Sequence, residues 1–209
     1  MRSMTPDALL EKISSPDAET RNEGWLGAAE AGVAAIKPLA AVLAQTAPVV
    51  AALARELAVL ERSGLDDALR ARIVAKQQEL SQPMEVSRAA RRSLWKIVRH
   101  AARPGAAKER DAAVAELGDL VRPTEPLVVR REAVAMLAEL PTDEAVEALA
   151  ELLDDEDLRD EACKALERIP TKKALAVLQD ALDTVSRDFR PSIARSLRAR
   201  GMDLPEETP

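Results

Sequence analysis

The chain has 209 residues, a net charge of −6 at pH 7 and an apolar content of 47%. It holds only two tryptophans and one phenylalanine, no tyrosine, one cysteine and one histidine, so its core must consist of alanine, leucine and valine. This composition argues against a β-rich fold, and it excludes an internal disulfide and any metal site built from several histidines.

The sequence also predicts neither a membrane-spanning segment nor a signal peptide. No uninterrupted apolar run of about 18 residues is present, so we expect no membrane span. The first 30 residues carry six acidic side chains, among them Asp7, Glu11, Asp17 and Glu19, and lack the apolar core of a signal peptide. We therefore expect a cytoplasmic protein.

In chain order, the first helical segment is residues 17–28, in which Arg21 is followed seven residues later by Ala28. Residues 48–82 come next, bounded by Ala47-Pro48 and Gln82-Pro83. They carry apolar residues at spacings of three and four on both sides of a Ser63-Gly64 turn, which predicts two antiparallel helices. Two interpretations stay open: an ordinary pair within a larger helical array, or a protruding hairpin or dimerisation seam.

Residues 85–97 return to the spacing of residues 17–28, with Ser87 and Leu94 at the two positions. The pattern becomes clear in the second half of the chain. Arginines 130, 159 and 190 lie 29 and 31 residues apart, and each is followed seven residues later by a leucine, at positions 137, 166 and 197. A period near 30 with helical spacing is typical of a repeat array, in which each unit buries its apolar face against its neighbours.

An amphipathic helix is also predicted before each clear copy. Residues 143–153 place their apolar side chains on one stripe and acidic ones opposite. Thr142 and Thr171 each follow a proline and are predicted N-caps. Each unit therefore consists of a first helix, a tight turn and a second helix, which gives about ten helices in one domain over residues 1–202. Residues 203–209 are expected to be a disordered tail.

A short pattern of an acidic turn, an aliphatic residue, arginine and alanine occurs in the second half of the chain. It is clearest at residues 157–162, Asp-Leu-Arg-Asp-Glu-Ala, and less close at residues 126–133. This pattern resembles HEAT repeats, particularly the short bacterial kind, over residues 15–46 and 83–201. The resemblance implies an all-α, right-handed α-solenoid of antiparallel helix pairs, with the second helix of each pair on the concave side.

Basic side chains gather on these second helices. Residues 86–103 carry six basic residues and no acid, whereas residues 143–157 carry eight acids and no base. If the resemblance holds, the concave side is locally basic and the back is acidic, with Trp95 at the edge of the basic surface. The predicted partner-binding residues are Arg88, Arg91, Arg92, Trp95, Lys96, Arg99, Arg130, Arg131, Arg195 and Arg198.

Two interpretations of this charge are open. The basic residues form either the ordinary solvated face of a helix or a surface that binds an acidic protein segment or a phosphate backbone. A sequence pI near 5.1 argues against general nucleic-acid binding. We therefore favour a non-enzymatic scaffold, monomeric or weakly dimeric, that binds an acidic protein or peptide without a cofactor.

Catalytic motifs are missing from the sequence. His100 is expected at an exposed helix end and Cys163 as a small buried side chain, and no nucleotide-binding glycine loop occurs. HEAT-like hydroxylases use repeated His-Glu pairs, and this chain has Arg99-His100-Ala101 instead. The alternative is a HEAT-like DNA-binding protein or alkylpurine DNA glycosylase-type enzyme, since Trp95 among arginines is similar to the basic face of those enzymes. Phycobilin lyase-type proteins share only the repeat consensus.

Overall fold

The computed structural model describes residues 4–62 and 66–204, and the regular structure within these ranges is entirely helical. It comprises ten α-helices and two short 3₁₀ helices, which confirms the all-α fold of about ten helices. Most of the predicted tail, residues 205–209, lies outside the described residues. The chain divides into two compact units, residues 1–100 and 101–209. The single domain over residues 1–202 stays a prediction, which equilibrium unfolding can test.

The first unit contains two helix pairs of very different length. Thr5 and Asp17 cap the first two helices by accepting hydrogen bonds from the backbone N–H groups of Ala8 and Thr20. Gly24 lets these two helices approach closely, because an added Cβ would lie 2.8 Å from the Cβ of Lys12. The elements are α1 (Pro6–Ser14), α2 (Ala18–Ala31), a 3₁₀ turn (Val33–Ala35), α3 (Ile36–Arg62) and α4 (Asp67–Ala101).

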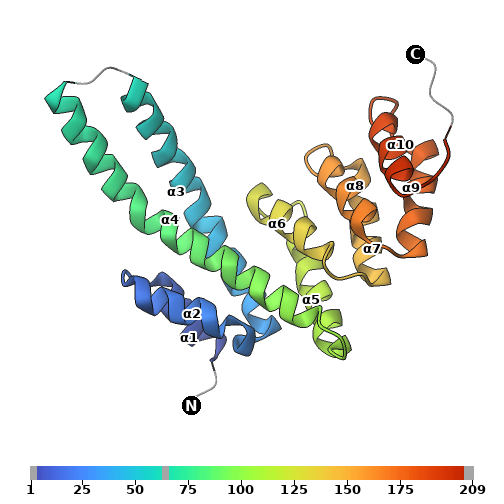
Figure 1. The fold of residues 1–209 in the computed structure, drawn as a ribbon, viewed down its shortest axis with the longest axis horizontal. Coiled ribbons are helices and arrows are strands. Elements are labelled where there is room, and N and C mark those ends of the chain that lie inside the picture. The colour runs from blue at the N-terminus through green and yellow to red at the C-terminus, as the bar shows by residue number, and fades with distance from the viewer. Residues whose placement is uncertain (1–3, 63–65, 205–209) are drawn as a thin grey trace. The chain divides into compact units, whose positions relative to one another are not determined.

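The helices α3 and α4 run through the prolines that were expected to end them. Pro48 lies inside α3, and Pro83 lies inside α4. A proline removes one N–H donor and can bend a helix without ending it when the neighbouring turns remain intact. As a result α3 has 27 residues and α4 has 35, and Figure 1 shows both extending away from α1 and α2. Residues 48–82 thus lengthen one helix pair, which favours the interpretation as a protruding hairpin.

The helix α3 also bears on the membrane prediction. The stretch Val33–Arg62 is long and apolar enough to cross a membrane by length and composition, with a mean hydropathy of 1.6 in its most apolar window. The sequence pattern missed it because single polar residues interrupt the run. One such helix is weak evidence, since core helices of globular proteins have the same length and composition, and it does not establish a membrane.

The second unit contains three helix pairs arranged in two rows. Figure 1 shows α6, α8 and α10 as one row, and α5, α7 and α9 form the other. Thr142 and Thr171 accept hydrogen bonds from the N–H groups of Ala145 and Ala174, which confirms both predicted N-caps. The helices are α5 (Ala107–Leu120), α6 (Leu127–Leu137), α7 (Asp143–Ala150) with a 3₁₀ turn (Glu151–Asp154), α8 (Arg159–Arg168), α9 (Lys172–Thr184) and α10 (Arg190–Ala199).

The repeat register is visible in the core of the second unit. Leu137, Leu166 and Leu197 occupy the same register position on α6, α8 and α10, and each is 0% exposed. Burial of these leucines confirms the repeat inferred from their spacing, because side chains at one position of stacked helix pairs meet the same kind of neighbour.

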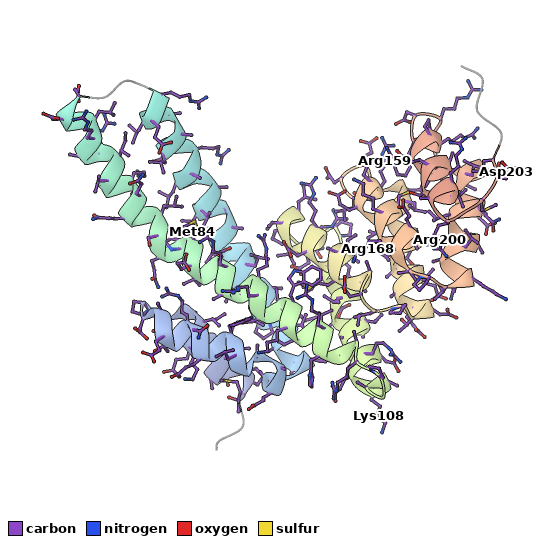
Figure 2. All side chains as sticks on the ribbon, viewed as in Figure 1. Met84, Lys108, Arg159, Arg168, Arg200 and Asp203 are labelled. Carbon is purple, nitrogen blue, oxygen red and sulfur yellow. The ribbon has the colours of Figure 1, made fainter. Side chains whose placement is uncertain are left out.

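Polar contacts also recur with the repeat and join consecutive helix pairs of the second unit. Arg159, at the start of α8, pairs with Asp188 at 2.7 Å and stacks over the ring of Phe189, ahead of the next repeat helix. Arg168, at the end of α8, pairs with Glu139 at 2.6 Å. Arg200 donates to the carbonyl of Ile169 at 2.6 Å and so satisfies the backbone just after α8. Figure 2 shows these three arginines on the second unit.

Candidate functional site

The predicted basic surface is partly assembled on the first unit. Six side chains line a hollow of about 590 Å³ between α2 and α4. Five of them are predicted site residues on α4, and the sixth comes from α2. Among the residues that the structure describes, no acidic side chain lines this hollow. We call it the basic hollow; its lining residues are Trp25, Arg91, Arg92, Trp95, Lys96 and Arg99.

The amphipathic pattern of α4 places these residues together. Its opposite face, which carries Ala90, Leu94, Ile97 and Ala101 at helical spacing, is at most 2% exposed. Packing of that face in the core fixes the rotation of α4 about its axis. The basic residues, which alternate with the apolar ones in sequence, are thereby presented on the surface next to α2.

Trp25 and Trp95 organise the cations of the basic hollow. The guanidinium of Arg92 lies 4.5 Å from the centre of the Trp25 ring, and the Nζ atom of Lys96 lies 5.0 Å from it. The guanidinium of Arg99 lies 5.2 Å from the Trp95 ring. Cation–π stacking of this kind holds the charge over the ring, and it leaves the N–H edge of a guanidinium able to bind a carboxylate or phosphate.

Lys96 has a second fixed contact. Its Nζ atom donates a hydrogen bond of 2.7 Å to the backbone carbonyl of Leu26 at the edge of the hollow. The Leu26 side chain itself is 54% exposed. The site therefore combines positive charge with indole surface.

Sequence reasoning did not include Trp25 among the site residues. Trp25 follows Arg21 by four residues, as Arg91 follows Ser87 in the same register. Because equivalent positions on neighbouring second helices meet in a repeat array, this register could have placed Trp25 beside the turn of α4 that carries Arg91 and, next to it, Arg92.

Arg88 lies in a smaller hollow beside the first, of about 250 Å³, which shares Trp25 and Arg92 with it. Arg88 pairs with Glu85 at 2.8 Å, and Glu85 also lines this space. The acid partly neutralises this end of the surface, so the positive charge is concentrated around Trp25 and Trp95.

The predicted site residues of the second unit have different surroundings, and none lines the basic hollow. Arg130 is 6% exposed. Its Nε atom donates to the carbonyl of Val121 at 2.9 Å, and its guanidinium pairs with Asp155. Its assignment to a partner-binding surface is therefore corrected: the side chain is buried, and its hydrogen bonds join neighbouring repeats.

The remaining three predicted residues of this unit are exposed. Arg131 pairs with Glu161 at 3.2 Å, and Arg195 and Arg198 lie on the outer surface of α10. The acidic segment of residues 143–157 is also partly paired, since Lys173 contacts Glu147 at 2.5 Å and Asp143 at 3.6 Å.

His100 and Cys163, the residues considered for catalysis, lie where the sequence placed them. His100 is exposed in the last turn of α4. Cys163 is 2% exposed, and its sulfur lies 3.3 Å from the hydroxyl of Ser196. Burial raises the pKa of the Cys163 thiol, which opposes formation of a nucleophilic thiolate. Within residues 4–62 and 66–204, no cluster of three or more His, Cys, Asp or Glu side chains could hold a metal ion.

Comparison with known proteins finds a similarity within the second unit. Residues 114–198, from α5 to the end of α10, match the family model described as HEAT repeats. No curated protein matches the chain.

Proposed function

Residues 114–198 belong to the HEAT-repeat family, whose members are generally protein-interaction scaffolds and typically not enzymes, and on this premise we propose that the chain binds an acidic protein segment in the basic hollow. One observation carries the proposal. Four cations and two indoles converge in the hollow without an acid among its lining residues, although the chain as a whole carries a net charge of −6.

Electrostatics support an acidic partner. A local cluster of like charge attracts oppositely charged segments even on a protein of the other net sign, and it increases their association rate. The guanidinium groups stacked on Trp25 and Trp95 are already ordered, so binding a carboxylate costs them little side-chain entropy. The indole rings then provide apolar contact for the aliphatic parts of the same segment.

A nucleic-acid ligand is the second candidate, because arginines and exposed indoles also bind phosphates and stacked bases. The acidic pI of about 5.1 opposes it. A glycosylase-type reaction would further need a carboxylate facing the substrate, and none lines the basic hollow within the described part of the chain. The acidic protein segment is therefore the better match.

Tryptophan fluorescence offers a direct test. The chain has two tryptophans and no tyrosine, and both tryptophans line the basic hollow, so the intrinsic emission reports on this site. We expect a glutamate-rich peptide to change the emission saturably and to bind more weakly as salt is raised. A single-stranded oligonucleotide titrated in parallel tests the second candidate.

A charge-reversed variant with Arg92, Lys96 and Arg99 changed to glutamate should lose this binding. A matched control changes the exposed Lys108, Lys164 and Arg187, which lie outside the hollow, to glutamate, and it should keep the binding despite an equal change in net charge. Circular dichroism checks that both variants are folded. Equal binding by the two variants, or binding of the oligonucleotide alone, would refute the proposal.

A pull-down from nuclease-treated source lysate with the same two variants would then identify the partner. A protein captured by the wild type and the control, but not by the charge-reversed variant, is expected. Capture that disappears on nuclease treatment would favour the nucleic-acid candidate instead.

A further inference from the structure

The distal halves of α3 and α4 expose an apolar surface that the basic hollow does not use. Val49, Val59 and Val74 are 46%, 57% and 51% exposed, and they are three of the four large apolar side chains exposed in the described chain. Only 28% of the most apolar window of Val33–Arg62 is buried. Between residues 48 and 82, Leu53 and Leu69 are the only described residues in the core. Two helices that pack only on each other leave much of their apolar surface in water.

This surface is also hollowed. A depression of about 650 Å³ lies between the two helices, with Val59, Leu60 and Ala75 in its lining. Charged side chains surround these apolar residues. Lys76 contacts Glu56 at 2.9 Å from the opposite helix and Glu79 at 2.7 Å on its own helix. The arrangement, apolar in the middle and charged at the rim, is that of an interface between proteins.

The charge of the hairpin indicates what covers it. Residues 48–82 carry five basic and five acidic side chains, so the segment is neutral within a chain of net charge −6. A neutral, mixed rim offers no selective attraction to an acidic segment or to an anionic lipid surface. It is complementary to itself, because a twofold axis places each residue of one copy against a different residue of the other and so can pair unlike charges.

We propose that the α3–α4 hairpins of two copies pack face to face over this depression, forming a four-helix bundle that buries Val49 and Val59. Each helix segment in the contact is roughly 20 Å long and about 10 Å wide. The two helices of one copy then bury on the order of 400 Å², or about 800 Å² in total for the pair, which is below the roughly 1,200 Å² of standard specific interfaces and in the range of weak, transient ones. The dimer is therefore weak, with a dissociation constant on the order of micromolar. It is independent of the basic hollow.

Sedimentation velocity of the full chain tests the dimer. At a concentration of about 100 µM, above the expected dissociation constant, we expect a species of about twice the 22.6 kDa of one chain. Changing both Val49 and Val59 to glutamate should shift the dissociation constant by more than about tenfold, because association would bury unpaired carboxylates. The two valines are 46% and 57% exposed, so the variant should keep its helical content.

Leu26→Glu is the matched control, since Leu26 is 54% exposed and lies outside the hairpin. It should dimerise like the wild type. Milder Val49→Ala and Val59→Ala changes should weaken the dimer without adding charge. A monomeric wild type at this concentration, including one that sediments only with lipid vesicles, would overturn the proposal. A glutamate variant that dimerises as tightly as the wild type would also overturn it.

Discussion

Replacing Arg130 by alanine should destabilise the second unit substantially, whereas replacing its neighbour Arg131 should have little effect. The Arg130 side chain is 7% exposed and pairs with Asp155, whose side chain is 23% exposed. Loss of the guanidinium leaves the Asp155 carboxylate with backbone N–H groups as its donors, that of Asp157 among them, and it leaves the Val121 carbonyl without the Arg130 N–H. Arg131 by contrast is 51% exposed in its pair with Glu161.

The size of the effect follows from these exposures. Breaking a buried ion pair on one side costs about 3–5 kcal/mol, and the residual solvent access of Asp155 reduces this to about 2–3 kcal/mol. A surface pair such as that of Arg131 is worth less than about 1 kcal/mol. If the cost arises from the unpaired carboxylate, Arg130→Ala combined with Asp155→Asn should cost less than the sum of the two single changes.

Urea unfolding followed by circular dichroism measures both free energies of unfolding. Tryptophan fluorescence is unsuitable, because both tryptophans lie in the first unit. A titration of each variant with the glutamate-rich peptide shows whether either arginine also contributes to peptide binding. The reasoning is refuted if Arg130→Ala costs as little as Arg131→Ala. It is also refuted if Arg130→Ala abolishes peptide binding at unchanged stability, since Arg130 would then belong to the binding surface.

Three further outcomes are expected. Leu166→Ala removes a side chain that is 0% exposed and should cost about 2–5 kcal/mol of unfolding free energy, whereas Leu26→Ala, at an exposed position, should cost under about 0.5 kcal/mol in the same assay. Burial raises the pKa of the Asp155 carboxyl. Hydrogen bonds from Arg130 and from backbone N–H groups lower it by more, so the pKa in the folded protein lies below the ordinary value of 3.8. The stability contributed by this pair should therefore be fully present above pH 3.8 and be lost as the pH falls through the lower folded pKa, with a shallower acid-side decline in Asp155→Asn. Burial raises the pKa of the Cys163 thiol, so a thiol reagent should label the native chain slowly and label one thiol per chain in urea; fast native labelling would contradict the packing of α8.

Helix boundaries and the repeat register could be predicted where they depend on nearby residues. Thr142 and Thr171 cap helices because each hydroxyl accepts from an N–H group three residues ahead. The buried face of α4 and the leucines at 137, 166 and 197 follow from helical periodicity. Both signals operate within a few turns of one helix, so they are visible in a single sequence.

The length of α3 and α4 could not be predicted in the same way. Pro48 and Pro83 were interpreted as helix ends, because proline lacks the N–H donor that continues a helix. Whether a proline ends a helix or only interrupts one hydrogen bond depends on what the turns on both sides pack against. In this protein α3 and α4 pack beside each other, with Lys76 contacting Glu56 across the pair.

The sequence by itself determined that the protein is a helical repeat array, which side of each helix is apolar, and that α4 carries a row of cations. Only the tertiary structure decided which cations face solvent and which are buried. Arg130 meets Asp155, 25 residues away, and becomes structural, whereas Arg92 meets Trp25, 67 residues away, and stays at the surface. Both arginines lie on the second helix of a helix pair. Their roles differ because burial and pairing depend on distances between residues far apart in the chain, and local periodicity carries no information about those distances.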